Sequence, residues 1–165
     1  MRINAKQARS PLFLLSLLTC MVAGGVYGGS ACEFQKRATI EIVRDQATVA
    51  VFAVSLADTP QRRRRGLMHC PALSPETGML FVYPTPGKRV FWMKNTIIEL
   101  AIIFISADGR VSAIARGEPG SLARIRSPEN TRLVLEVNYA ESRQLAVGDR
   151  VRWRPTPGAD DHPHS

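Results

Sequence analysis

Hydrophobic and polar residues alternate over short stretches of this chain, and the alternation predicts strands rather than long helices. Residues 39–44 and 48–57 follow a period of two, which is typical of a strand with one buried face. In residues 131–139 the same period places Leu133, Leu135 and Val137 on one face. Further strands are expected at residues 79–83, 89–96, 98–105, 110–115 and 151–153.

Turn and helix signals separate these strands. Asp108-Gly109 is a hairpin signal. After the second strand, Asp58 or Thr59 can cap a helix whose first turn holds Pro60 and which ends near Gly66. The pattern predicts a β-rich α+β fold, with a small barrel-like or strongly curved, mostly antiparallel sheet and one or two short helices.

The domain boundaries follow from the same pattern. Residues 39–154 form a single β-rich domain, and residues 32–38 are a short segment in front of it. Residues 155–165 are polar and proline-containing, and we expect them to be a disordered tail.

The first 31 residues have the features of a secretory signal peptide. Arg2, Lys6 and Arg9 precede an apolar stretch at residues 11–22, and small residues at 29–31 suit cleavage after Ala31. The apolar stretch is shorter than the roughly 20 residues of a membrane span, so no transmembrane segment is expected in the mature chain. This predicts a periplasmic or secreted protein. An uncleaved anchor is one alternative, and a lipoprotein tethered through Cys32 is another.

Export changes the meaning of the basic composition. The chain carries a formal charge of +8, and removing the three basic residues of the signal leaves +5. An exported protein is not expected to bind nucleic acid, so the candidate partners are a small polar or anionic ligand or another envelope protein. No cofactor is expected. The other interpretation of the charge is a solvated arginine-rich surface.

The cysteine content does not indicate a metal site. Cys20 falls within the signal, which leaves Cys32 and Cys70 as the thiols of the mature chain. An oxidising compartment permits a disulfide between them, and two separate thiols are the alternative. No cysteine or histidine spacing resembles a zinc site, and none is predicted.

The chain resembles the family catalogued as domain of unknown function 192, which is common among small exported prokaryotic proteins. The resemblance covers about residues 40–153 and rests on seven motifs in the same order. These are Arg63 with Gly-Leu-Met at 66–68, Gly-Met-Leu-Phe at 78–81, Phe-Trp-Met-Lys-Asn-Thr at 91–96, Phe-Ile at 104–105, Asp-Gly at 108–109, Leu-Glu-Val at 135–137 and Gly-Asp at 148–149. The family has no established activity, so the resemblance implies a fold but no reaction.

One departure from the family pattern bears on function. The family usually has Pro-Leu-Asp where this chain has Glu99-Leu100-Ala101. Residues two apart on a strand share a face, so the Glu99 carboxylate is a candidate replacement for the missing acid at Ala101. Simple loss of the family's function at this position is the rival interpretation.

The candidate ligand-binding residues are Trp92, Lys94, Asn95, Thr96, Glu99 and Arg63. Trp92 offers a large aromatic face, while the polar run after it offers hydrogen-bond donors and acceptors. The alternative for Asn95 and Thr96 is a turn in which they bond to nearby backbone. Arg63 is expected either to pair with a carboxylate such as Glu136 or to contact an anion.

These residues lead to three hypotheses about function. The first is a small-ligand-binding or accessory module of the cell envelope that uses residues 92–96. The second is an envelope enzyme acting on a glycan or another small polar substrate. No catalytic constellation is visible in the sequence, so no catalytic residues are assigned. The third is a structural partner of another envelope protein.

Overall fold

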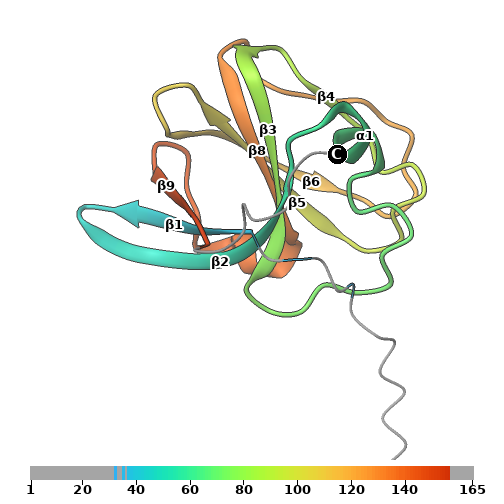
Figure 1. Cartoon of the computed structure of the whole chain (residues 1–165), viewed down its shortest axis with the longest axis horizontal. Helices are drawn as coiled ribbons and strands as arrows, with labels where there is room; N and C mark the ends of the chain where they lie inside the picture. The colour runs from blue at the N-terminus through green and yellow to red at the C-terminus, as the bar shows by residue number, and fades with distance from the viewer. Residues whose placement is uncertain (1–31, 33–34, 36, 157–165) are drawn as a thin grey trace, which may run out of the picture.

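The computed structural model describes residues 32, 35 and 37–156 of the chain (Figure 1). The predicted signal peptide and most of the predicted tail lie outside the described residues. The elements, in order, are β1 (Ala38–Arg44), β2 (Ala47–Ala57), α1 (Pro60–Arg65), β3 (Thr77–Gly87), β4 (Val90–Phe91), β5 (Leu100–Ser106), β6 (Val111–Gly117), β7 (Ile125–Arg126), β8 (Thr131–Asn138), the 3-10 helix η1 (Tyr139–Gln144) and β9 (Arg150–Pro155).

Seven of the strands form one large sheet in the order β6-β5-β8-β3-β2-β1-β9. Every neighbouring pair is antiparallel except β2 and β3, which run parallel. Parallel strands need a crossover connection, and α1 with the loop after it supplies one here. The remaining strands, β4 and β7, pair with each other in a separate two-stranded sheet. The predicted β-rich α+β class with a mostly antiparallel sheet and two short helices is confirmed.

The large sheet is strongly curved, but it does not close into a barrel. Its edge strands β6 and β9 meet at one end only, through a bridge between Arg110 and Arg150. Backbone bonds from Val111 to Asp149 at 2.9 Å and from Val151 to Gly109 at 2.8 Å hold this contact. The rest of β6 has no partner in β9, so the barrel-like alternative is wrong. The meeting point is fixed by Asp149, whose carboxylate accepts hydrogen bonds from Arg44 Nε and Nη2 at 2.7 and 2.8 Å.

Apolar side chains pack on both faces of the central strands. One cluster fills the concave side and includes the three residues of β8 that were predicted to share a face, Leu133, Leu135 and Val137. The second cluster lies on the convex side and includes Phe81, Phe104 and Val134. All of β5 from Leu100 to Ile105 is buried, as expected for a strand covered on both faces. In Figure 1, β1 and β2 curve across one side of the β3–β8 pair, while α1 and β4 lie on the other.

One local prediction from the sequence is wrong, and one element had no predicted position. The expected strand at residues 89–96 is reduced to Val90–Phe91, because the chain turns immediately afterwards. Asn95 has a left-handed φ of 59°, and the Thr96 amide donates to the carbonyl of Met93 at 3.0 Å to close the turn. Asparagine tolerates this backbone conformation better than most residues. The 3-10 helix after β8 was not anticipated.

The short helix begins and ends where the capping signals place it. The Thr59 hydroxyl accepts from the amide of Arg62 at 3.2 Å, and Pro60 occupies the first turn. Gly66 ends the helix with φ 48° and ψ −135°, a conformation reserved for glycine. The turn then buries Leu67 in the convex cluster, which fixes α1 above the sheet. No helix in the part of the chain described here combines the length and the apolar character that a membrane crossing needs.

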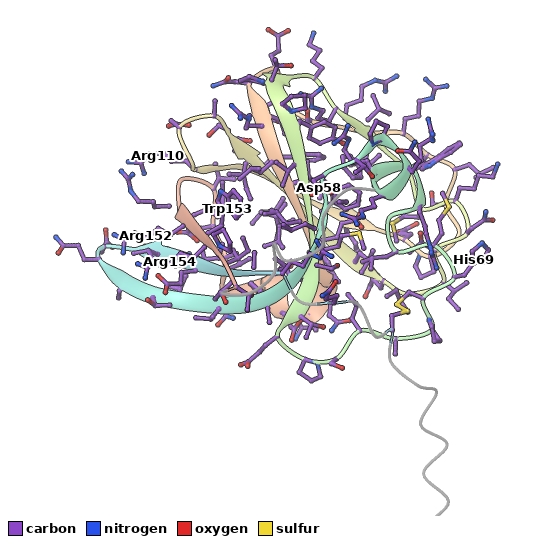
Figure 2. All side chains as sticks on the ribbon, viewed as in Figure 1. Asp58, His69, Arg110, Arg152, Trp153 and Arg154 are labelled. Carbon is purple, nitrogen blue, oxygen red and sulfur yellow. A yellow bond between two sulfur atoms is a disulfide. The ribbon has the colours of Figure 1, made fainter. Side chains whose placement is uncertain are left out.

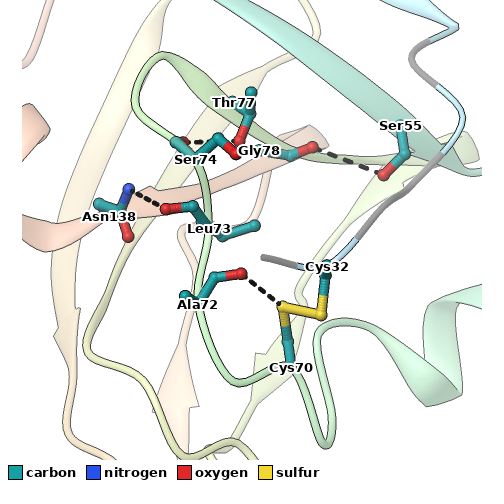
Figure 3. The surroundings of a disulfide bond; sticks show 9 residues. All are labelled: Cys32, Ser55, Cys70, Ala72, Leu73, Ser74, Thr77, Gly78 and Asn138. Atoms are coloured by element: carbon teal, nitrogen blue, oxygen red, sulfur yellow. Dashed lines mark hydrogen bonds between the residues drawn. A yellow bond between two sulfur atoms is a disulfide. The ribbon is translucent and has the colours of Figure 1, made fainter. Parts of the chain in front are cut away.

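A disulfide joins Cys32 to Cys70, with the two Cα atoms 5.6 Å apart (Figure 3). The Cys32 amide also donates to the carbonyl of Ala72 at 2.9 Å. Cys70 is fully buried and packs in the convex cluster with Leu67 and Leu73. The bridge therefore ties the segment in front of β1 to the loop that follows α1.

Replacing both cysteines with serine is expected to lower the free energy of unfolding by about 3–4 kcal/mol. The bridge spans 38 residues, and releasing a loop of this length restores entropy to the unfolded chain. Urea denaturation of the oxidised wild type, the reduced wild type and Cys32→Ser/Cys70→Ser measures the change. A double variant that is as stable as the oxidised protein would show that the bridge does not hold the loop.

Candidate functional site

A cavity of about 450 Å³ lies over the convex face of the sheet, between α1 and the β4–β7 sheet. Its walls come from segments far apart in the sequence: α1 and the turn after it, β3, β4 with the residues after it, and β8. The lining residues that matter below are Arg63, Arg64, Arg65, Gly66, Phe81, Tyr83, Trp92, Thr96 and Glu136. Four of the family motifs, at residues 66–68, 78–81, 91–96 and 135–137, therefore contribute to one site.

Glu136 is the unusual residue of this cavity. It lies in the middle of β8 on the convex face, directly opposite Met79 of β3 and Ile102 of β5. Only 5% of its surface is exposed. No ion pair or side-chain hydrogen bond within residues 37–156 engages its carboxyl group. Arg89 Nε is the one fully buried side-chain nitrogen or oxygen without a partner among the described residues, so the Glu136 oxygens retain access to the cavity. A carboxyl group with so little exposure and no partner is still uncommon outside functional sites.

The surroundings of Glu136 favour its neutral form. Burial among apolar side chains raises the pKa of Glu136 to about 8, from an ordinary value near 4.5. At neutral pH the group is therefore largely protonated and carries one hydrogen-bond donor. A neutral acid in an apolar site can donate a hydrogen bond to an acceptor on a ligand, which an ionised carboxylate cannot do.

Gly66 leaves the space next to this acid. A Cβ atom at Gly66 would lie 3.2 Å from Cζ of Phe81 and 4.0 Å from Oε2 of Glu136. The residue is thus required twice, for its backbone conformation and for its missing side chain.

Arg63 supports the wall of the cavity through the backbone rather than through an acid. Its Nη1 donates to the carbonyls of Asp58 at 2.6 Å and Val82 at 2.8 Å. Its guanidinium also lies 5.0 Å from the centre of the Tyr83 ring, over which Arg89 lies at 4.0 Å. The expected pairing of Arg63 with Glu136 is not observed.

Arg64 and Arg65 lie at the exposed rim of the cavity. Within the described part of the chain neither side chain forms an ion pair. The rim is therefore positively charged above a neutral acid. An anion entering the cavity would meet guanidinium donors first and the Glu136 proton last.

The structure brings three of the six sequence-predicted site residues to this cavity. Arg63, Trp92 and Thr96 line it, and Trp92 remains 49% exposed at its wall. Lys94 lies outside the lining, with Nζ 5.3 Å from the Trp92 ring centre. Asn95 occupies the turn, where its carbonyl accepts from the amide of His69 at 2.8 Å.

Glu99 also lies outside the cavity lining. It precedes β5 at the surface, and its carboxylate forms an ion pair with Arg116. Arg116 is the residue opposite Ala101 in the β5–β6 register. The carboxylate is thus held beside strand position 101, but not beside Glu136.

Sequence reasoning passed over Glu136 as a site residue. The signal was present, because an acid interrupts the apolar run of β8 at a position that shares its face with buried Val134. Only the packing of β3 and β5 on either side shows that this acid has no partner. Among the described residues, no group of three or more histidine, cysteine, aspartate or glutamate side chains is arranged to hold a metal ion.

Replacing Glu136 with glutamine is expected to make the protein more stable than the wild type as the pH rises. The folded state keeps the Glu136 proton up to a pKa of about 8, whereas the unfolded chain releases it near 4.5. The contribution of Glu136 to the free energy of unfolding of the wild type is therefore largest below pH 4.5. It falls by about 1.4 kcal/mol per pH unit between 4.5 and 8. Glutamine does not titrate, so the difference in unfolding free energy between variant and wild type should grow over this window.

Urea denaturation of both proteins at pH 5, 6.5 and 8 measures this difference. Glu99→Gln is the matched control, because Glu99 is a surface carboxylate in an ion pair. A constant difference between Glu136→Gln and the wild type at all three values would mean that Glu136 titrates normally.

Comparison with known proteins places the fold in a family. The sequence model of domain of unknown function 192, described as an uncharacterized ACR family, matches residues 41–153. A protein of unknown function from Novosphingobium aromaticivorans DSM 12444 is 34% identical, with a TM-score of 0.66 over 70% of this chain and 84% of that one. A putative transcription regulator from Sinorhizobium meliloti 1021 is 31% identical, with a TM-score of 0.68 over 74% of this chain and 98% of that one.

No curated protein matches the chain. The family match covers all the strands that build the cavity, and both solved structures share the fold at more than 30% identity. The chain belongs to the domain of unknown function 192 family.

Proposed function

We propose that this protein is an exported small-ligand-binding module whose cavity over β8 holds a small anionic ligand. The observation that carries the proposal is Glu136, a carboxyl group that is 95% buried, has no partner among the described residues and faces a cavity with an arginine rim. A polar group kept in this state has its hydrogen-bonding capacity reserved for something that enters the cavity.

The charges around the cavity favour an anion. Arg64 and Arg65 attract it at the rim, and a guanidinium can bind a carboxylate or phosphate through two parallel hydrogen bonds. Protonated Glu136 donates one hydrogen bond to a ligand oxygen at the floor. Phe81 and Trp92 form apolar wall around these groups, which suits a ligand with a carbon skeleton.

Binding of such an anion requires that Glu136 keeps its proton. If Glu136 ionised, two negative charges would face each other in an apolar site, and the ligand would be repelled. Affinity should therefore be highest below the pKa of Glu136, which is about 8, and should fall above it.

The predicted location outside the cytoplasm is part of this proposal. The Cys32–Cys70 disulfide supports it, because such bridges persist in oxidising compartments. The bridge also distinguishes two fates of the N-terminus. A lipid thioether on Cys32 would use the same sulfur as the disulfide, so a tethered lipoprotein and the bridged form exclude each other.

An enzyme is the second candidate, and it too depends on Glu136. A carboxyl group with a pKa of about 8 is suited to act as a general acid near neutral pH. Glycoside hydrolysis normally needs two carboxyl groups, whereas Glu136 is the one acid among the lining residues. Cys70 is in a disulfide and offers no nucleophile. Binding is therefore the better supported activity.

Citrate, D-glucuronate and inorganic phosphate, titrated into the full chain by isothermal calorimetry, test the proposal. At least one of them should bind at pH 6, and its affinity should fall about tenfold per pH unit above 8 as Glu136 ionises. Glu136→Gln keeps a donor in the cavity, so it should bind at pH 6 and lose this dependence on pH. Arg64→Gln/Arg65→Gln should weaken binding at every pH.

Glu99→Gln is the matched control for these variants. Its carboxylate lies outside the cavity, so binding and its pH profile should equal those of the wild type. A reduced affinity in this variant would instead favour Glu99 as the family's displaced acid. Anion binding that is insensitive to Glu136→Gln across the pH range would reject the cavity as the site.

A further inference from the structure

The β4–β7 sheet has an outer side that is exposed to solvent, and two of its residues, Val90 and Trp92, also border the cavity described above. Phe91 is 8% exposed and packs inward opposite Ile125, so the neighbouring positions point outward by strand alternation. Val90 on this outer side pairs with Arg126, and continuing the register sets Trp92 opposite Arg124. Apolar and basic residues therefore alternate over one small surface.

The exposed apolar side chains of the molecule concentrate here. The described residues include seven large hydrophobic side chains with high exposure, and four of them belong to this region: Val90, Trp92, Ile97 and Leu122, at 56, 49, 61 and 66%. Two backbone bonds hold their segments together. Gly120 donates to the carbonyl of Thr96 at 2.8 Å, and Met93 donates to that of Ser121 at 2.9 Å.

The charges of the same region are mostly positive. Lys94, Arg124 and Arg126 are exposed on residues 90–97 and 118–126, and Glu118 is the one acid in these two segments. Lys94 lies with Nζ 5.3 Å from the Trp92 ring centre. An exposed tryptophan beside aliphatic tips and basic side chains is a combination suited to the interface of a bilayer.

We propose that this face docks on an anionic lipid bilayer, through six residues: Trp92, Lys94, Ile97, Leu122, Arg124 and Arg126. The two aliphatic tips and the indole enter the boundary between headgroups and acyl chains. Lys94 and the two arginines remain at the level of anionic headgroups, where each basic side chain adds to the attraction. We call this surface the docking face.

A second basic surface shows that charge alone does not define such a face. Arg150, Arg152 and Arg154 are exposed on β9, at the edge of the large sheet. Figure 2 shows Arg152 and Arg154 on the opposite side of the molecule from His69, whose amide bonds to the turn that carries Lys94. Charged side chains on an edge strand prevent pairing with other sheets, which accounts for the β9 arginines without a ligand. They supply a matched control.

The two tryptophans of the chain make the test specific to the docking face. In Trp153→Phe, Trp92 is the only tryptophan, and in Trp92→Phe, Trp153 on β9 is the only one. Each full-length variant is mixed with vesicles of phosphatidylcholine alone, or with vesicles in which 30% of the lipid is phosphatidylglycerol. The readouts are the emission maximum and quenching by brominated acyl chains. Both readouts are local, so membrane binding by the N-terminal apolar segment does not imitate a contact of Trp92.

The Trp92 reporter should shift its emission to the blue and be quenched by brominated lipid on the anionic vesicles. The Trp153 reporter should do neither. In the Trp92 reporter, Lys94→Gln/Arg124→Gln should raise the lipid concentration needed for half of the response by roughly 25-fold. Each basic residue accounts for about fivefold of this increase. Arg152→Gln/Arg154→Gln removes the same charge from β9 and should leave the titration unchanged.

Three outcomes would overturn the proposal: no response of Trp92, an equal response of Trp153, or an equal loss in the β9 control. Glu136→Gln should dock like the wild type, because Glu136 is only 5% exposed and does not reach the surface that would meet the bilayer. Trp92 borders both the cavity and the docking face, but Glu136→Gln changes only the cavity and Lys94→Gln/Arg124→Gln only the docking face. The two sets of variants therefore separate a failure of anion binding from a failure of docking.

Discussion

The central strands of this protein are apolar on both faces, and this constraint shapes the rest of the molecule. A sheet buried on two sides needs two covers. The concave cover is the sheet itself, because β1, β2 and β9 curve over the inner face and complete a cluster with Leu80, Ile103 and Leu135. The convex cover is assembled from short pieces, namely α1, the disulfide-linked loop after it and the β4–β7 sheet.

The two covers differ in what they allow. The concave side is covered by continuous strands with alternating side chains. The convex cover is made of a six-residue helix, a turn and a pair of two-residue strands, and such pieces cannot seal a whole sheet face. The space they leave lies above Glu136. The cavity and an acid without a partner among the described residues are thus two results of the same incomplete cover.

The pieces of the convex cover are also fixed by polar contacts and by the disulfide. Arg63 binds two carbonyls across the gap between α1 and β3, and the Cys32–Cys70 bridge holds the loop. Gly66 lets the chain leave the helix without filling the cavity. The Arg residue, the glycine and the aromatic residues of the family motifs therefore build one structure, the cover and its cavity. This explains how motifs that are separate in the chain contribute to one structure.

Much of the fold follows from local patterns. The period of two placed Leu133, Leu135 and Val137 on one face, and Thr59, Pro60 and Gly66 marked the helix, because capping and strand alternation depend on near neighbours. The strand expected at residues 89–96 failed because the left-handed turn at Asn95 is stabilised by contacts with residues 69 and 120, far away in sequence. Barrel closure failed for a related reason, since it depends on whether β6 and β9 meet along their whole length.

The candidate site divides in the same way. The sequence by itself determined which residues carry chemistry near the motif at 91–96, and it brought Arg63, Trp92 and Thr96 into consideration. Only the tertiary structure decided that Glu99 pairs with Arg116 while Glu136 has no partner among the described residues. The ionisation of a carboxyl group depends on the apolar surface and charges that surround it, and those neighbours come from strands that are distant in sequence. For that reason the sequence shows that residue 136 is an acid, but only the fold shows that it belongs to a candidate site.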